Sequence, residues 1–100
     1  MNLNLNYEGF ETNLIGRFNS IMDGVQYKFK FDNCYGASVV KHRGSYGHKE
    51  DLWELAVLMF YRSIPDDRGV LCYNTPITND VLGWLTDEEV RNLLVRIKEL

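Results

Sequence analysis

Several features are scarce or missing in this sequence of 100 residues. No apolar run approaches the roughly 18 residues that a membrane-spanning helix needs. Residues 1–6 have neither the basic stretch nor the apolar stretch of a secretory signal peptide. Only two cysteines are present, Cys34 and Cys72. We therefore expect a cytoplasmic protein with no membrane contact, in which both cysteines are reduced thiols; a disulfide is the alternative.

An excess of positive charge is also missing. The chain has 11 Lys and Arg against 14 Asp and Glu, which gives a formal net charge of −3. Residues 41–49 contain three of the cations and no acid, so the other 91 residues together carry −6. This balance argues against attraction of the whole surface to nucleic acid or to an anionic membrane. Binding of an anion would have to be local.

The length and the apolar content predict one packed unit. A chain this short can bury one hydrophobic core but not two, so we expect residues 1–100 to form a single domain. Apolar residues make up 45% of the chain and aromatic residues 13%, which argues against disorder.

Hydrophobic periodicity predicts a first helix over residues 8–22. Apolar residues at Phe10, Leu14 and Phe18 recur every four positions, as on one face of a helix. Glu8 and Glu11 would lie in its first turn, where the helix dipole favours acidic side chains.

Three strands are predicted next. Residues 25–31 alternate between apolar and polar side chains, residues 32–36 are rich in turn formers, and residues 37–42 return as a second strand. Residues 52–61 are almost continuously apolar, which suits a central strand covered on both faces. Because this run also contains good helix formers, a helix is the alternative.

The C-terminal third predicts a fourth strand and two helical elements. Residues 70–73 would form the strand, and residues 80–85 a short helical turn. Thr86 and Glu89 have the spacing of a capping box, and the residues after them place apolar side chains on one helical face. We therefore predict an α+β fold, in which an antiparallel meander of three to four strands packs against an N-terminal helix and a C-terminal helix.

Four stretches, residues 31–40, 45–47, 52–58 and 73–86, resemble a family of short, mostly uncharacterised proteins of tailed bacteriophages and prophages. The resemblance covers about residues 25–100. It departs from the family pattern at Cys34 and His48, where glycine is common. The resemblance implies a setting, the cytoplasm of an infected bacterium, and it assigns no activity to any residue.

The basic, glycine-rich loop of residues 41–49 is the main candidate binding site. Glycines let backbone N–H groups turn toward an anion, Arg, Lys and Ser side chains can hold phosphate oxygens, and a tyrosine can stack on a base. The alternative is a solvated loop whose glycines only turn the chain. The candidate binding residues are Lys41, His42, Arg43, Ser45, Tyr46, His48 and Lys49.

Metal binding and catalysis find less support. The four possible zinc ligands match no zinc motif, and the predicted hairpin separates Cys34 from His42. His42 or His48 could be paired with Cys34, Ser45 or Asp51, but the sequence contains no nucleophile or cofactor motif. We expect no enzyme activity, no metal and no cofactor. The possible zinc ligands are Cys34, His42, His48 and Cys72.

Residues 75–85 offer a second possible surface. Trp84 and Leu85 are expected in the core. The segment around Pro76 is expected to connect the sheet with the last helix. The alternative is that Pro76, Ile77 and Trp84 form an exposed patch for a partner.

These observations favour a small, non-catalytic phage accessory protein that binds a host or phage macromolecule, such as an inhibitor of a host enzyme or of a defence component. One alternative is a nucleotide or nucleic-acid binding protein that uses the loop of residues 41–49. Another is a structural or assembly protein of the virion that self-associates through a sheet edge.

Overall fold

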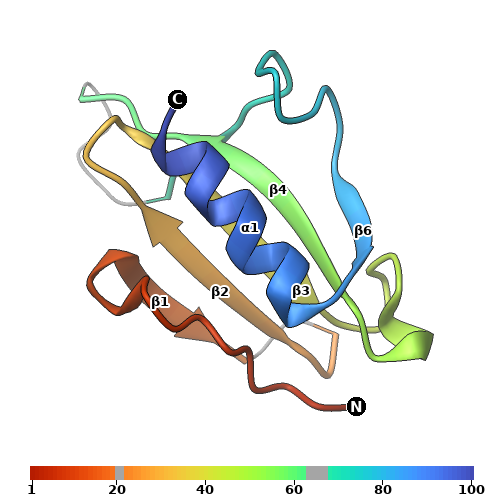
Figure 1. Cartoon of the computed structure of the whole chain (residues 1–100). Coiled ribbons are helices and arrows are strands. Elements are labelled where there is room, and N and C mark those ends of the chain that lie inside the picture. The colour runs from red at the N-terminus through yellow and green to blue at the C-terminus, as the bar shows by residue number, and fades with distance from the viewer. Residues whose placement is uncertain (20–21, 63–67) are drawn as a thin grey trace.

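The structure is a computed structural model that describes residues 1–19, 22–62 and 68–100. These residues form an antiparallel sheet of six strands, with β1 to β4 in sequence order and with β5 and β6 both pairing with β4. The helix α1 lies across one face of the sheet (Figure 1). The elements are η1 Glu11–Asn13, β1 Leu14–Phe18, β2 Val25–Lys30, β3 Tyr35–Lys41, η2 His48–Glu50, β4 Trp53–Met59, β5 Val70–Leu71, β6 Leu82–Leu85 and α1 Asp87–Lys98.

The predicted N-terminal helix is wrong. In the described part of residues 8–22, the chain forms only the short 3-10 turn η1 and then the strand β1, which pairs antiparallel with β2. The apolar residues do not share one face, because Phe10 is buried against Phe31 whereas Phe18 is exposed beside Lys28. Pairing with the edge of β2 therefore outweighs the helical spacing. Residues 20–21 of the predicted helix lie outside the described residues.

The predicted strands over residues 25–61 are confirmed. β2 pairs with β3 from Val25↔Lys41 to Lys30↔Gly36, and β3 pairs with β4 from Tyr35↔Met59 to Val40↔Glu54. The segment predicted over residues 52–61 is thus a strand, β4, and not a helix. It is the central strand that its apolar composition indicated, with neighbours on both edges.

The free edge of β4 explains why the helical turn predicted over residues 80–85 does not form. The predicted strand over residues 70–73 is short: β5 pairs only with Leu58 and Met59. The other end of the same edge is therefore left for β6, which pairs through Leu85 and Leu82. The helical turn predicted over residues 80–85 is therefore wrong, because Leu82–Leu85 form the strand β6. Pairing with an open sheet edge satisfies backbone groups that a single helical turn would leave without partners.

The C-terminal helix is confirmed at its predicted start. Thr86 is the N-cap of α1: its hydroxyl accepts a hydrogen bond from the backbone N–H of Glu89, and the Glu89 carboxylate accepts one from the backbone N–H of Thr86. This capping box satisfies two N–H groups at the start of the helix. The buried face of α1 consists of Val90, Leu94 and Ile97.

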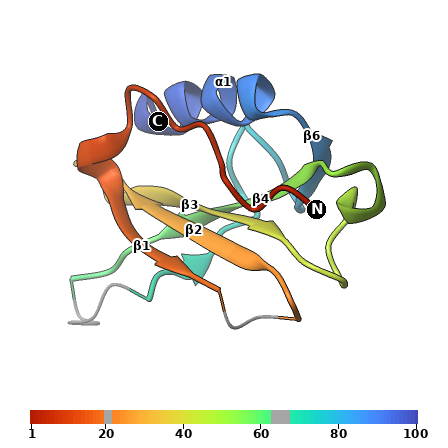
Figure 2. The same cartoon turned by 90° about the horizontal axis from the view of Figure 1, so that it is seen from below.

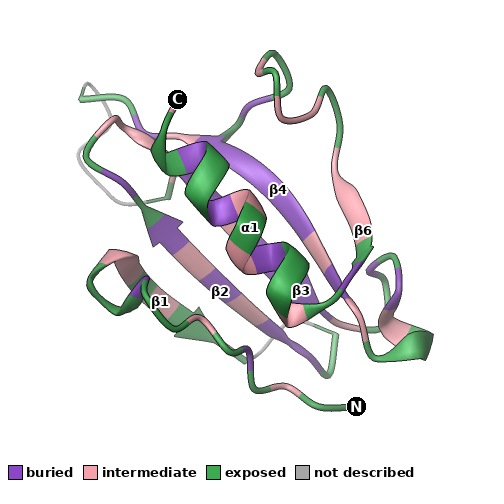
Figure 3. Ribbon diagram, in the orientation of Figure 1, coloured by how far each residue is buried: buried purple, intermediate pink, exposed green. Residues whose placement is uncertain are grey.

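The core lies between α1 and the sheet. Buried residues alternate along β2 and occupy most of β4 (Figure 3). From β4, Trp53, Leu55 and Val57 join the same core as the apolar stripe of α1. Residues 1–7 run as an extended segment beside the helix and above the sheet (Figure 2). The predicted packing of the sheet against two helices is therefore wrong: within the described residues the sheet has one α-helix, α1, and η1 and β1 stand where the N-terminal helix was expected.

Candidate functional site

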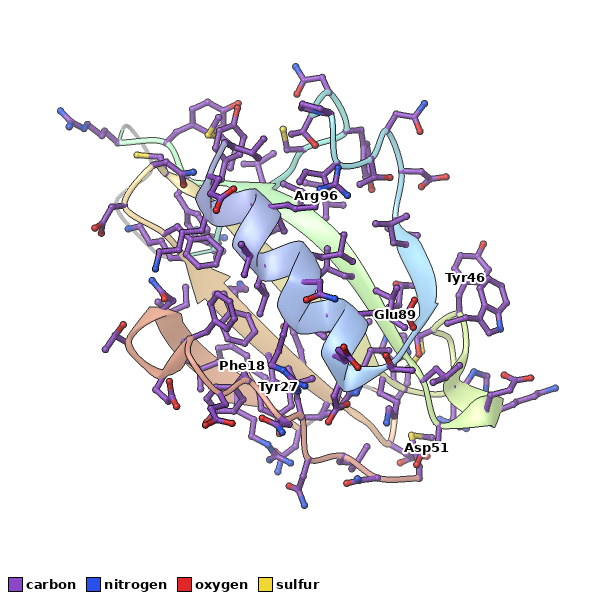
Figure 4. All side chains as sticks on the ribbon, in the orientation of Figure 1. Phe18, Tyr27, Tyr46, Asp51, Glu89 and Arg96 are labelled. Carbon is purple, nitrogen blue, oxygen red and sulfur yellow. The ribbon has the colours of Figure 1, made fainter. Side chains whose placement is uncertain are left out.

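The loop between β3 and β4 reaches solvent with part of its side chains. Arg43, Tyr46 and Lys49 are exposed. Tyr46 points away from the sheet at the edge marked by β6 (Figure 4). His42 and His48 are half-buried, and Lys41 and Ser45 are buried. The predicted binding residues are thus divided between the surface and the interior.

Lys41, one of the candidate binding residues, does not lie at the surface. Its side chain is 2% exposed, and its ammonium donates hydrogen bonds to Asp51 Oδ1 at 3.1 Å and to the carbonyl oxygen of Asn2 at 2.8 Å. The ammonium also lies 4.2 Å from the ring centroid of Trp53. A buried lysine with three partners cannot be used to bind an external anion without disrupting the fold.

The remaining positive charge of the loop is small. Arg43 forms an ion pair with Asp23, with 3.1 Å between Nε and Oδ2, and both side chains are largely exposed. Lys49 is exposed and has no ion-pair partner among the residues that the structure describes. Glu50 is exposed directly beside it. Two of the three loop cations are therefore matched by carboxylates, and the loop presents no concentrated positive patch.

Ser45 and the two histidines shape the loop. The Ser45 hydroxyl donates to the carbonyl oxygen of His42 at 2.9 Å and accepts from the His42 backbone N–H at 3.0 Å. His42 Nδ1 accepts from the Gly44 N–H, and His48 Nδ1 lies 2.8 Å from the carbonyl oxygen of Ser45. The serine hydroxyl is thus engaged with main-chain atoms, and both imidazoles brace the turn.

An aromatic pair stands beside this loop. Tyr46 and Trp84 stack with their ring centroids 5.4 Å apart and an interplanar angle of 27°. They are 56% and 55% exposed, respectively, although aromatic side chains of this size are usually covered. The favoured core position of Trp84 is wrong, and the exposed alternative holds for this residue. We call Tyr46 and Trp84 the aromatic patch.

Close backbone contacts hold the aromatic patch together. The Trp84 N–H donates to the carbonyl oxygen of Tyr46 at 3.4 Å, and the Tyr46 N–H donates to Glu54 Oε1 at 3.0 Å. Gly83 permits this approach, because a Cβ there would lie 2.5 Å from the Cβ of Tyr46. Trp84 itself has φ +55°, a left-handed conformation that is rare for a bulky residue. The surrounding contacts therefore keep an exposed tryptophan in a strained backbone position.

A shallow pocket opens next to the aromatic patch. Its volume is about 240 Å³, and it combines the two aromatic rings with one imidazole, one ammonium and one carboxylate. Such a mixture of apolar and polar groups suits the insertion of a partner side chain. The lining residues are Ser45, Tyr46, Gly47, His48, Lys49, Glu50 and Trp84.

The cysteines and the histidines do not come together. Cys34 is half-buried in the turn between β2 and β3, Cys72 is buried, and both are free thiols. Within residues 1–19, 22–62 and 68–100, no three His, Cys, Asp or Glu side chains lie close enough to hold a metal ion. The part of the chain that the structure describes also contains no helix with the length and apolar character needed to cross a membrane.

Comparison with protein-family models, with curated proteins and with solved structures found no match to this chain. The resemblance to short phage proteins therefore stays a prediction.

Proposed function

We propose that this protein acts by binding another protein through the aromatic patch, without catalysis. The supporting observation is the stack of Tyr46 and Trp84, two large rings left in solvent on one surface. Tyrosine and tryptophan are over-represented among the residues that dominate binding energy at protein interfaces. A rigid pair also loses little conformational entropy on binding, because its rings are already ordered by contact with each other.

The charges near the patch favour a protein partner over a nucleic acid. Bases could stack on exposed rings, and Lys49 could contact a phosphate. However, Lys41 and Arg43 are paired with carboxylates, and Glu50 lines the same pocket as Lys49. A site that binds phosphates needs uncompensated cations, because neutralisation of the backbone supplies most of the affinity.

The biological setting of the proposal comes from the resemblance to phage proteins. A small phage accessory protein of this kind would work in the cytoplasm of the infected host, where it would bind a host or phage protein and inhibit it. The compact scaffold supports this role, because the aromatic patch is presented by a loop and a strand that are anchored on the central strand β4.

Affinity capture from a lysate of infected bacteria can test the proposal. The wild-type protein would be compared with the variants Tyr46→Ala and Trp84→Gly. Tyr61→Ala is the matched control, because Tyr61 is 53% exposed but follows the opposite end of β4. We expect a specific protein to be captured by the wild type and by the control. Its affinity should fall by about 30-fold or more in the patch variants, as is typical for a residue that dominates an interface.

Equal capture of that protein by all four forms would contradict the proposal. Binding to a labelled single-stranded oligonucleotide that weakens steeply between about 50 and 200 mM salt would instead favour the nucleic-acid alternative, since a packed protein interface changes little over this range.

A further inference from the structure

The N-terminal segment, which we define as residues 2–7, runs beside α1 and over the sheet (Figure 2). We use the word cleft for the set of side chains from α1, the sheet and Asp51 that hold this segment. It is extended but is assigned to no strand. The hydrogen bonds that tie its main chain to the rest of the molecule come from side chains distant in sequence. This is how a protein binds an extended peptide that does not join a sheet.

One end of the segment is held by an ion pair. Asp51 Oδ1 accepts a hydrogen bond from the backbone N–H of Asn2 at 2.7 Å. Lys41 Nζ donates to the carbonyl oxygen of Asn2 at 2.8 Å. The acid and the base thus bind both main-chain groups of one residue, and hydrogen bonds to charged groups are stronger than neutral ones.

The other end is held in the same way. Asp87 Oδ2 accepts from the backbone N–H of Asn6 at 3.0 Å, and Arg91 Nη1 donates to the carbonyl oxygen of Asn6 at 2.9 Å. Both side chains come from the first turns of α1. An acid and a base therefore bind the main chain at Asn6, as another acid and base do at Asn2, four residues earlier.

Tyr27 binds the middle of the segment. Its hydroxyl donates to the carbonyl oxygen of Leu3 at 2.9 Å and accepts from the backbone N–H of Leu5 at 3.3 Å. Arg17 Nη2 donates to the same Leu3 oxygen at 3.4 Å. The cleft therefore contacts main-chain groups from one end of the segment to the other.

Trp53 forms the floor that positions these groups. Its indole N–H donates to Asp87 Oδ1 at 2.6 Å, which orients the carboxylate toward the segment. The Lys41 ammonium lies over the indole ring, and the ring of Tyr27 packs edge-on against it at 5.7 Å. Figure 4 places Tyr27 and Asp51 along this same side of the sheet. One buried residue thus contacts three of the groups that bind the segment.

The segment also supplies matching side chains. Leu5 is buried, and Leu3 and Tyr7 pack against the core, whereas Asn2, Asn4 and Asn6 face solvent. This alternation is that of an extended chain with one apolar face. The turn that follows contains the exposed Gly9 with φ +95°, and the next residue, Phe10, is anchored in the core. The turn can therefore act as a hinge between the segment and the fixed part of the chain.

From this geometry we propose that the cleft is a binding site for an extended peptide, and that it accepts the N-terminal segment of a second copy of the chain. Two chains would then exchange residues 2–7 reciprocally. A second copy is the expected occupant because its segment matches the cleft at the main-chain groups and at the apolar side chains. Exchange of identical elements forms a closed, symmetric dimer without any new contact.

A hinge deletion tests the exchange in the otherwise complete chain. Without Glu8 and Gly9, the chain cannot reverse direction between Tyr7 and Phe10, so the segment can reach only the cleft of another molecule. We expect this variant to be a dimer by size-exclusion chromatography with light scattering. Adding Leu5→Asp, which places a charge in the apolar part of the cleft, should return it to a monomer. A monomeric deletion variant, or a dimer that Leu5→Asp does not disrupt, would overturn the proposal.

A peptide assay keeps the proposal testable if the deletion variant does not fold. Full-length Leu5→Asp leaves its own cleft open, and a fluorescein-labelled peptide of residues 1–9 would be the probe. We expect this peptide to bind the variant about tenfold or more tightly than the wild type, whose own segment competes at an effective concentration in the millimolar range. Equal fluorescence anisotropy with both proteins would rule out an exchangeable site.

Discussion

Lys41 Nζ lies 3.1 Å from Asp51 Oδ1, and this pair keeps the first cation of the basic loop away from the surface. The lysine is 2% exposed, whereas the Asp51 side chain is 48% exposed at the rim of the N-terminal cleft. The pair therefore serves the interior of the molecule by holding the backbone of Asn2. As a consequence, the binding surface that we propose is defined by the aromatic patch and not by positive charge.

Replacing Asp51 by Asn should lower the free energy of unfolding by about 1–3 kcal/mol, because the buried Lys41 loses its charged partner. Asn tolerates the left-handed backbone at this position, where φ is +62°, so the change isolates the loss of charge. Urea denaturation would measure the difference. The neighbouring Glu50→Gln should change stability by less than about 0.5 kcal/mol. Equal stability of Asp51→Asn and the wild type would contradict this role.

The contribution of Asp51 should depend on pH. The backbone N–H of Asn2, followed by Lys41, lowers the pKa of this carboxyl below its ordinary value of 3.8. Because the pKa of Asp51 is lower in the folded state, its charge contributes fully to stability at a pH well above the unfolded pKa of 3.8. This contribution is lost as the pH falls through the folded pKa. The stability difference between the wild type and Asp51→Asn should therefore be constant near neutral pH and shrink below about pH 3.8. A difference that grows on acidification would argue against this linkage.

At position 84, glycine should be tolerated better than alanine. Both substitutions remove the stack with Tyr46, but only glycine relieves the left-handed backbone conformation, which costs other residues about 1–2 kcal/mol. We expect Trp84→Gly to be more stable than Trp84→Ala by about 1 kcal/mol in chemical denaturation. If alanine were the more stable variant, Trp84 would not be strained.

Gly83→Ala should disturb the aromatic patch while leaving both rings in the chain. The added Cβ would lie 2.5 Å from the Cβ of Tyr46, so the loop and β6 must move apart. We expect partner binding to fall as it does in Trp84→Gly. Gly9→Ala is a control for backbone strain alone, because a Cβ at Gly9 meets no atom within 4 Å but its φ of +95° disfavours alanine, and Gly9 lies in the N-terminal turn and not in the patch. We expect this control to keep partner binding. Unchanged binding by Gly83→Ala would mean that the spacing of the two rings does not matter.

The cap of α1 gives a further prediction. Thr86→Ala removes the oxygen that accepts the Glu89 N–H and should lower the free energy of unfolding by about 1 kcal/mol. Thr86→Ser keeps the oxygen and should stay within about 0.5 kcal/mol of the wild type. Thermal denaturation of the three proteins would measure these differences. Similar losses for Ala and Ser would mean that the cap hydrogen bond is not what stabilises the helix.

The two elements that sequence reasoning missed have a common cause. Leu14 and Phe18 are spaced as on a helix, yet β1 forms because the edge of β2 offers hydrogen bonds to it. In the same way, residues 82–85 become β6 because β5 covers only one end of β4. Neither sheet edge can be read from the local pattern, since an edge exists only once the other strands have paired.

The proposed aromatic patch takes Tyr46 from the loop of residues 41–49, but the sequence did not indicate its stack with Trp84. The glycine-rich loop does reach solvent with Arg43, Tyr46 and Lys49, as its composition indicated. The burial of Lys41 depends on Asn2, Asp51 and Trp53, which are brought together only by folding. Likewise, Trp84 is exposed because β6 turns its side chain toward Tyr46 and away from the core.

The sequence by itself determined the elements whose signals are local. Alternation specifies β2, the continuous apolar run specifies β4, and the capping box specifies the start of α1, because each depends on neighbours within a few residues. Only the tertiary structure decided which sheet edges remained open, which charges were neutralised and which aromatic rings stayed in solvent. These outcomes depend on contacts between residues far apart in the chain, and such contacts leave no period or spacing in the sequence.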